Sequence, residues 1–419
     1  MKDSIIAGLD IGSTETRLVV GQRMQTDQGD RLQIVGALSV PSAGVSRGII
    51  NSIEDATACI SAVLEKAERL LGTNLESVWV GINGPSVKCQ NSRGVVAVSR
   101  SDSEVNQEDF ARVIEAAQAL ATPPNYEILH VIPLKFIVDN QEDVKNPIGM
   151  TGIRLEAVTL IVQNLSSQIK NFTKAVDHTS LSIDDIVFSP MAAASVVVSN
   201  KQKELGVAVI NIGASTTSLA VFEEGELIHA AVIPLGSSHI TSDIAIGLRC
   251  SIGLAEKIKI KYGSSRSDLF TKKDEVDISD LLEEEDGDDN PIISRKFIAD
   301  IIEARVEEIF EKVDAELNRI ERSGMLPAGL CLIGGGAKLS GLVETAKKKM
   351  RLPAHLGANR SVATVVDKVN ELEYLTALGL AVWGDQMSLD SQSPKRSLEI
   401  PAVGKAVNMV KGWLKNLKP

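Results

Sequence analysis

The chain has 419 residues, which is long enough for two or more domains with buried cores. Its formal net charge of -11, from 44 basic and 55 acidic residues, argues against nucleic acid as the main partner, because phosphate backbones require a basic surface. The chain carries neither a signal-peptide pattern nor a run of about 18 apolar residues, and its cysteines lack metal-ligand spacing, so we expect a cytoplasmic protein with four reduced thiols: Cys59, Cys89, Cys250 and Cys331.

The first predicted element is a β-hairpin in residues 5–22, IIAGLDIGSTETRLVVGQ. Gly12 in its tight turn lets the backbone approach a phosphate closely, and Ser13 and Thr14 supply N–H and hydroxyl donors. Asp10 would repel a phosphate unless a cation lay between them, which predicts Mg²⁺ held mainly through water, and Arg17 is placed to reach a β- or γ-phosphate. The alternative is a plain hairpin with a polar turn.

Helices and strands alternate in the residues that follow, which predicts an α/β fold. Helical spacing of apolar residues marks 55–72, which ends at Gly72, and 105–120, which begins at an Asn106 cap. Strands are predicted at 77–84 and at 127–139, the latter bulged or at an edge because of Pro133. A further helix is predicted at 189–199.

A second hairpin repeats the first. Residues 206–225 read GVAVINIGASTTSLAVFEEG, and an offset of 201 (211 minus 10) aligns Asn211 with Asp10. The same offset aligns Gly213 with Gly12, so we expect two similar halves whose turns face each other. Ser215 and Thr216 are the candidate phosphate donors of this second turn.

Two later segments complete the candidate nucleotide site. In the predicted helix 253–263, Glu256 and Lys259 share a face and are candidates for ribose contacts, the alternative being a solvent-exposed ion pair. Residues 328–349 predict a strand, a glycine triplet and a helix, where the missing side chains leave room for an adenosine, although such a triplet also suits a tight turn. The triplet consists of Gly334, Gly335 and Gly336.

Between these segments, residues 274–290 hold ten acids and no base, which predicts a disordered acidic loop. A long helix is predicted from 295 to 324, ending at Gly324. Residues 384–400 are polar and rich in turn formers, so we expect a flexible linker there.

The C-terminal segment contrasts with the acidic body, because it has four lysines and no acid from Pro401 onward. At 100° per residue its apolar side chains, with a tryptophan among them, gather on one face, which is typical of a helix lying in a membrane interface. The alternatives are docking on its own domain or in the groove of a partner. The residues expected at an anionic membrane are Val403, Val407, Val410, Lys411, Trp413, Leu414, Lys415, Leu417 and Lys418.

Together, the two hairpins, the glycine triplet and the helix between them resemble the ATP site of the actin, heat-shock chaperone and hexokinase superfamily. The segments 128–139, 146–162, 242–263 and 294–310 resemble the bacterial cell-division family FtsA, and the likeness covers almost the whole chain. It implies an actin-like, two-lobed α/β fold that binds ATP and Mg²⁺, polymerises with itself, and binds the C-terminal peptide of the tubulin-like FtsZ through Arg295 and Arg305.

The resemblance also implies a division of the chain. One lobe comprises 1–83 with 166–203 and 360–385, and the other comprises 204–230 with 320–359. The remaining parts are an inserted subdomain for self-association at 84–165, an outer subdomain for adenosine and FtsZ contact at 231–319, a linker at 386–400 and a membrane helix at 401–419.

Asn211 departs from the superfamily, whose members usually have Asp at this position. Asn keeps the shape and one carbonyl acceptor but removes a negative charge near the metal and the attacking water. Nucleotide binding is therefore expected, with at most weak ATP hydrolysis. The sequence predicts a scaffold that anchors the FtsZ ring to the cytoplasmic face of the inner membrane and recruits later division proteins. The rivals are a small-molecule kinase of the same superfamily and an actin-like scaffold of pilus assembly.

Overall fold

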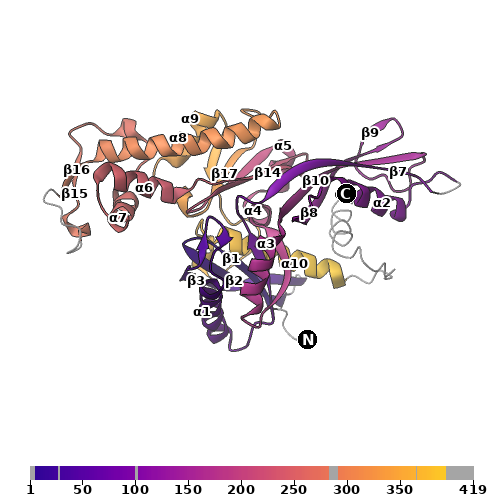
Figure 1. Cartoon of the computed structure of the whole chain (residues 1–419), viewed down its shortest axis with the longest axis horizontal. Helices are drawn as coiled ribbons and strands as arrows, with labels where there is room; N and C mark the ends of the chain where they lie inside the picture. The colour runs from indigo at the N-terminus through magenta and orange to yellow at the C-terminus, as the bar shows by residue number, and fades with distance from the viewer. Residues whose placement is uncertain (1–4, 27–28, 100–101, 283–290, 365, 393–419) are drawn as a thin grey trace.

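The structure is a computed structural model that describes residues 5–26, 29–99, 102–282, 291–364 and 366–392. It comprises two lobes and a third, smaller unit that projects from them (Figure 1). None of the described helices is long and apolar enough to cross a membrane. The candidate membrane residues from Val403 to Lys418 lie outside the described residues.

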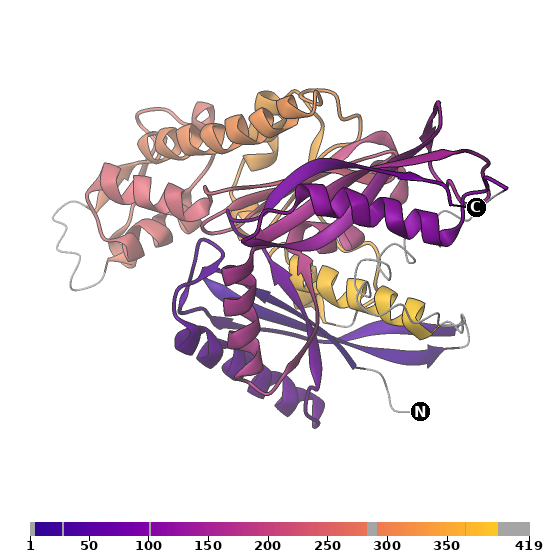
Figure 2. The same ribbon diagram turned by 45° about the vertical axis from the view of Figure 1, so that its right-hand side comes forward.

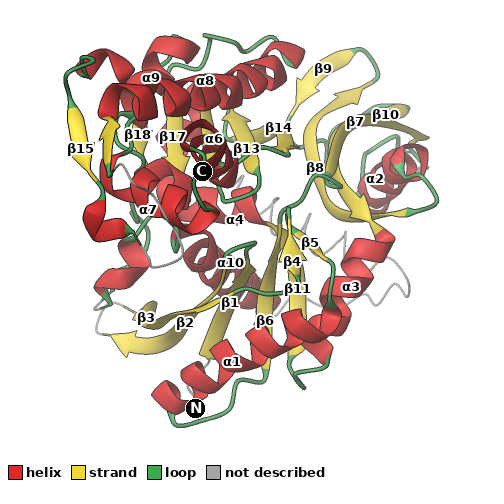
Figure 3. Ribbon diagram, turned by 60° about the vertical axis from the view of Figure 1, so that its left-hand side comes forward, coloured by secondary structure: helices red, strands yellow, loops and turns green. Residues whose placement is uncertain are grey.

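The first lobe is built on a five-stranded sheet in the order β11-β6-β1-β2-β3. Helices cover both faces, α1 and α3 on one side and α4 and α10 on the other (Figures 1 and 3). The strands are β1 (Ile5–Ile11), β2 (Glu15–Thr26), β3 (Gly29–Pro41), β6 (Ser77–Ile82) and β11 (Ser182–Phe188), and the helices are α1 (Ile53–Leu71), α3 (Ser166–Asp177), α4 (Ser189–Val197) and α10 (Leu375–Gln392).

The second lobe has the same sheet topology, in the order β14-β13-β12-β17-β18. In each sheet, three antiparallel strands continue into parallel ones, so β12 corresponds to β1 and β17 to β6. This confirms the predicted internal repeat. The strands are β12 (Val207–Ile212), β13 (Thr217–Glu223), β14 (Glu226–Ile233), β17 (Gly329–Ile333) and β18 (Ala354–Leu356).

All six residues of β12 are buried, because helices pack on both faces of its sheet. Ala208, Ile210 and Ile212 join the outer core under α8, whereas Val207 and Val209 join the core shared with α4 and α10. The helices of this lobe are α5 (Asn200–Leu205), α6 (Ser237–Leu248), α7 (Ile252–Tyr262), α8 (Arg295–Arg319) and α9 (Leu342–Met350).

The projecting unit is a four-stranded antiparallel sheet with one helix, α2, packed on it (Figure 2). A register shift opposite Val158 and Thr159 leaves Leu134 as an extra residue beside Pro133, which confirms the predicted bulge in β8. Asn106 caps α2 as predicted, in a capping box with Asp109. The elements are β7 (Lys88–Ala97), α2 (Gln107–Ala121), β8 (Tyr126–Val138), β9 (Gln141–Val144) and β10 (Arg154–Leu165).

Three sequence predictions about order and length were wrong. The long helix α8 ends at Arg319 rather than at Gly324, because Arg322 N turns back to the carbonyl of Leu317. Within the acidic segment, β15 (Glu275–Asp277) pairs with β16 (Ile292–Ser294), and Ile278 is buried between them and the lobe, so the described part is ordered. Residues 283–290 lie outside the described residues.

The third correction concerns the expected linker, because α10 continues to Gln392. The stretch after Gly384 contains no glycine or proline before Pro394, so nothing interrupts the helix. In addition, Arg23 on β2 holds the helix through its guanidinium, which donates to Asp385 Oδ1 at 2.6 Å and to the Asp385 carbonyl at 2.7 Å.

Candidate functional site

The two hairpin turns have the same geometry. In the first, Gly12 N donates to Glu15 O at 3.1 Å, and in the second, Gly213 N donates to Thr216 O at 2.9 Å. A Cβ on Gly12 would lie 2.7 Å from Glu15 O, so this tight turn requires glycine. Each turn therefore presents bare backbone, which suits a phosphate better than a side-chain-covered turn would.

Asp10 is the penultimate residue of β1, beside Gly81 of β6 and opposite Arg17 of β2. Burial raises the pKa of Asp10 to about 6, although the positive charge of Arg17 acts against this rise. A single half-buried carboxylate of this kind fits a Mg²⁺ ion that keeps most of its water and also binds phosphates. The described residues contain no cluster of three acidic, histidine or cysteine ligands that would hold a metal by themselves.

Arg17 does not extend freely from the sheet. Its Nη2 donates to Glu15 Oε2 at 2.6 Å, and its guanidinium lies 5.6 Å from the centre of the Tyr374 ring. The buried Arg17 Nε has no hydrogen-bond partner among the described residues. One buried donor of this side chain, close to Asp10, is therefore left without a partner in the described part of the chain.

Asn211 is the counterpart of Asp10, and its environment is neutral. Its Nδ2 donates to Thr376 Oγ1 at 3.2 Å, and the residue opposite it on β13 is Ser218, whose buried hydroxyl lacks a partner among the described residues. Sequence reasoning noted Asn211 but missed Ser218 and Thr376. The offset of 201 that aligns the hairpins also aligns Ser218 with Arg17, so that signal was available, whereas Thr376 is brought in only by the fold.

Both hairpins contact the start of the same helix. Arg17 stacks on Tyr374 and Asn211 bonds to Thr376, two residues apart at the N-terminus of α10. Both hairpins are therefore joined to one short segment, while the facing of their two turns stays a prediction.

The glycine triplet packs against the second hairpin. Gly334 has a φ of 88°, and a Cβ there would lie 2.3 Å from Asn211 Oδ1. A Cβ on Gly336 would lie 2.6 Å from Ile212 Cγ2, whereas a Cβ on Gly335 would meet nothing within 4 Å. The outer glycines are therefore needed for packing, and Gly335 alone borders open space.

Glu256 and Lys259 form more than a solvent-exposed pair. Lys259 Nζ donates to Glu256 Oε2 at 2.7 Å and to Thr241 Oγ1 at 2.8 Å, and its side chain is 11% exposed. Thr241 belongs to α6, whose first residue, Ser237, donates its N–H to Gly213 O at 2.9 Å. These bonds connect α7 through α6 to the second phosphate turn.

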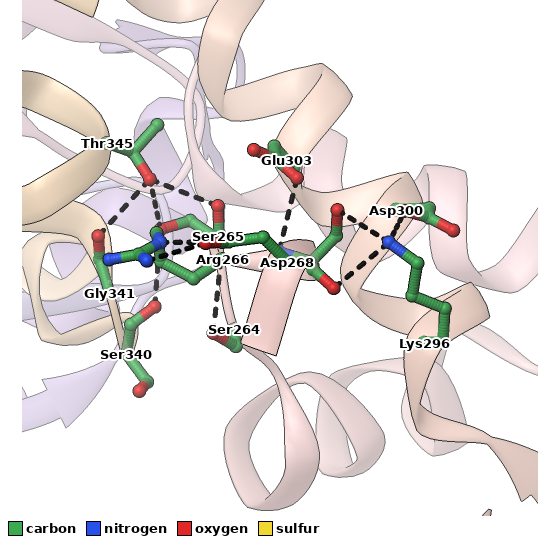
Figure 4. Close-up of polar contacts among 11 residues, drawn as sticks. Ser264, Ser265, Arg266, Asp268, Lys296, Asp300, Glu303, Ser340, Gly341 and Thr345 are labelled. Carbon is green, nitrogen blue, oxygen red and sulfur yellow. Dashed lines mark hydrogen bonds and ion pairs between the residues drawn. The ribbon is translucent and has the colours of Figure 1, made fainter. Parts of the chain in front are cut away.

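A polar cluster fixes the loop after α7 against α8 and the start of α9 (Figure 4). Ser264 forms a parallel bridge with Ser340, and Ser265 Oγ lies 2.9 Å from Thr345 Oγ1. Ser267 N donates to Glu303 Oε2 at 3.1 Å. Because these polar groups bond to one another, the cluster stabilises the packing of α7, α8 and α9 and does not offer a ligand-binding site.

Two cavities lie away from the candidate nucleotide residues. One of about 320 Å³ is bordered by Lys135 and Glu223, and one of about 610 Å³ by Leu32 and Val362. Neither includes a predicted nucleotide residue, so neither supports the candidate site.

Comparison with known proteins identifies the family. A family model described as cell division protein FtsA matches residues 208–379, and one for the SHS2 domain inserted in FtsA matches 84–163. The FtsA of Pseudomonas aeruginosa is 36% identical over 390 residues, covering 93% of this chain and 91% of the relative. The FtsA of Borreliella burgdorferi is 33% identical over 413 residues, covering 99% of this chain and 98% of the relative. This chain belongs to the FtsA family of cell-division proteins.

Solved structures agree on the fold of this FtsA-family chain. The PilM–PilN complex of type IV pilus biogenesis matches with a TM-score of 0.64 and 18% identity, covering 90% of this chain and 98% of that one. MreB5 of Spiroplasma citri bound to ADP matches with a TM-score of 0.54 and 12% identity, covering 93% of this chain and 99% of that one. These likenesses confirm the predicted actin-like α/β fold.

The two candidate FtsZ-binding arginines of this FtsA-family chain both lie on α8, but the structure does not bring them together. Ten residues of helix separate them by about 15 Å along the axis. Arg305 donates from Nε to Asp243 Oδ2 at 2.6 Å and from Nη2 to Asp243 Oδ1 at 2.9 Å, and it also bonds to Glu308. The Arg295 guanidinium lies 4.5 Å from the centre of the Phe270 ring.

Proposed function

We propose that this protein is an ATP-binding, actin-like scaffold that polymerises and anchors the FtsZ ring to the cytoplasmic face of the inner membrane. The observation that carries the proposal is that two equivalent glycine hairpins both contact residues 374–376, through Arg17 of β2 and Asn211 of β12. Membership of a cell-division family supports the role, and the similar MreB5 structures, one bound to ADP and one to AMPPNP, support a nucleotide as the ligand.

The residues fit ATP with Mg²⁺. The glycine N–H groups close the two turns by donating to Glu15 O and Thr216 O, so the phosphates would be bound by the backbone N–H groups that follow Gly12 and Gly213. Gly335 borders space for the adenosine. Asp10 would hold the hydrated ion, which supplies positive charge against the phosphates. The proposed nucleotide residues are Asp10, Gly12, Ser13, Thr14, Arg17, Asn211, Gly213, Ser215, Thr216, Glu256, Lys259, Gly334, Gly335 and Gly336.

Hydrolysis is proposed to be very slow. The positions opposite one another in the second hairpin are Asn211 and Ser218, neither of which carries a charge. A water near the terminal phosphate would therefore lack a carboxylate from this hairpin to orient it or accept its proton. We propose that nucleotide controls polymerisation rather than being consumed rapidly.

Membrane attachment is proposed for the segment after α10. The basic, amphipathic sequence of 401–419 supports this part of the proposal. The last described helix, α10, ends at Gln392, a few residues before this segment. One copy with four lysines would bind an anionic surface reversibly, at about 1 kcal/mol per lysine, and a polymer presenting many copies would bind far more tightly.

The two rivals fit the observations less well. A small-molecule kinase has no use for the basic amphipathic C-terminal segment. A pilus-assembly scaffold fits the fold, yet the identity to PilM is 18% against 36% to an FtsA.

The deciding experiment is co-pelleting with anionic vesicles, with and without ATP, of the full chain and of a chain ending at Gln392. The full chain should pellet, more strongly with ATP, and the shortened chain should stay in solution. Ending the chain at Gln392 rather than Gly384 keeps α10 and its contact with Arg23 intact. Equal pelleting of the two chains would contradict the membrane anchor.

A further inference from the structure

A small hairpin after the first lobe's third strand has an unusual turn. The strands β4 (Val45–Ser46) and β5 (Ile49–Ile50) pair so that Arg47 and Gly48 alone connect them. Both residues have positive φ, 53° for Arg47 and 67° for Gly48. A two-residue turn with positive φ at both positions favours Asn, Asp or Gly at the first of them, so an arginine there is conformationally costly.

The tip of this hairpin is fixed against the first phosphate turn. Gly48 N donates to Ser13 Oγ at 3.3 Å. A Cβ on Gly48 would lie 1.8 Å from Asn83 O, and a Cβ on Gly84 would lie 2.8 Å from Gly48 O. The tip is thus held between Ser13 and the loop after β6, and Arg47 is the residue next to that contact.

Arg47 differs from Arg17, the other arginine near this turn. It is exposed and forms no ion pair with any residue in the described part of the chain. Arg17 is bonded to Glu15 and stacked on Tyr374, at a strand position opposite Asp10. Arg47 instead directly precedes Gly48, whose N–H bonds to Ser13 of the turn itself.

We propose that Arg47 binds the terminal phosphate of the nucleotide and makes the site prefer ATP to ADP. The inference rests on the proposed nucleotide binding and extends it to a residue that sequence reasoning passed over. A guanidinium forms paired, charge-assisted hydrogen bonds with phosphate oxygens, and its fixed charge suits the outermost, most negative group. The second hairpin offers no charge at Asn211 or Ser218, and Arg47 beside the first turn can supply one.

This role explains the local geometry. The Gly48–Ser13 bond fixes the hairpin tip beside the phosphate turn, so binding orders the arginine side chain but does not have to order the loop that carries it. The strained backbone conformation of Arg47, which would suit asparagine better, is then explained by the need for a positive charge at this position.

The test measures dissociation constants of the full chain for Mg²⁺ with a non-hydrolysable ATP analogue and for Mg²⁺ with ADP, by titration calorimetry. Arg47→Asn removes the charge while suiting the turn, and Arg47→Lys keeps the charge but not the planar fork. Arg69→Gln, an exposed arginine in the last turn of α1, is the charge-matched control. Thermal melting of each variant checks the fold.

We expect Arg47→Asn to weaken binding of the ATP analogue about ten- to a hundredfold and that of ADP less than about threefold. Arg47→Lys should recover part of the preference, and Arg69→Gln should change neither constant. Equal losses for both nucleotides, or constants like those of the control, would overturn the role of Arg47 while leaving nucleotide binding intact. A wild-type chain that binds neither nucleotide would overturn both proposals.

Discussion

Asp10 and Asn211 occupy equivalent positions in two β-hairpins whose strands pair in the same register. Each is the penultimate residue of its strand, Asp10 opposite Arg17 and Asn211 opposite Ser218. One hairpin therefore has an acid and a base where the other has an amide and a hydroxyl. Because Arg17 and Asn211 both contact residues 374–376, this difference gives the two paired hairpins a charged half and a neutral half.

Restoring the acid tests the meaning of the neutral half. Asn211→Asp should raise ATP hydrolysis by about a hundredfold, within the range that general-base assistance contributes. The fold should survive, because the new carboxylate can accept a hydrogen bond from Thr376 Oγ1, which now accepts one from Asn211. Phosphate release at saturating ATP is the measurement, with Asp10→Ala as a variant that should weaken Mg²⁺-dependent binding. Equal rates for wild type and Asn211→Asp would mean that residue 211 only shapes the turn.

The glycine triplet offers a matched pair of substitutions. Gly335→Ala should fold normally, since its Cβ meets nothing within 4 Å, yet it should weaken ATP binding by occupying space for the adenosine. Gly334→Ala should lower the melting temperature instead, because its φ is 88° and its Cβ would lie 2.3 Å from Asn211 Oδ1. Melting curves and nucleotide titrations of both variants check this. Unchanged ATP binding in Gly335→Ala would place the adenosine elsewhere.

The proposed FtsZ contact predicts that substitutions at Arg305 and at its ion-pair partner Asp243 change peptide affinity in opposite directions. Arg305→Met should weaken binding of an FtsZ C-terminal peptide by about 1.5–3 kcal/mol, as for a lost charge-assisted contact. Asp243→Asn should strengthen it, because the Arg305 guanidinium is now held by Asp243 at 2.6 and 2.9 Å. Fluorescence anisotropy with a labelled peptide measures both. Losses of equal size in the two variants would point to local damage rather than to a binding role.

Stability should depend on pH through His130, which lies on β8 and joins the sheet of the projecting unit to the first lobe. Its Nε2 accepts from Phe188 N at 2.9 Å, and burial lowers the pKa of His130 to about 4. The unfolded chain binds a proton there below about pH 6.5, whereas the folded chain does so only below about 4. The free energy of unfolding should therefore fall as pH falls through this window, by about 2 kcal/mol at about pH 5.

The matched variant for this effect is His130→Gln, whose amide oxygen can accept the same N–H. Denaturant titrations at about pH 7 and pH 5 should show a stability gap between the two proteins that changes by about 2 kcal/mol. Asp10 contributes a dependence of opposite sign, because its pKa is raised, but it is present in both proteins and cancels. A gap that does not change with pH would contradict the assignment to His130.

For the proposed membrane segment, 401–419, two substitutions should separate the apolar from the electrostatic contribution to vesicle binding. Trp413→Glu should abolish binding to anionic vesicles and leave nucleotide binding unchanged, since it places a charge on the apolar face. Lys411→Ala should weaken vesicle binding modestly and make it less sensitive to salt. Vesicle co-pelleting across salt concentrations checks both. Binding by Trp413→Glu at the wild-type level would contradict the predicted orientation.

Local sequence was sufficient for features that depend on backbone chemistry. The turns at Gly12 and Gly213 were predicted from their glycine and hydroxyl residues, and the cap at Asn106 because its side chain bonds within one helical turn. The internal repeat was predicted because aligned residues take aligned positions in the two sheets. These are short-range relationships, and they are the same in any context.

Tertiary structure decided what depends on residues far apart in the chain. Thr376 reaches Asn211 across 165 positions, and Gly48 reaches Ser13 across 35, so no local pattern reveals either bond. The polar ending of α10 reads as a linker, yet Arg23 holds it as helix through Asp385. A polar sequence is free to be helix or coil in isolation, and only the packing partner supplies the free energy that selects one of them.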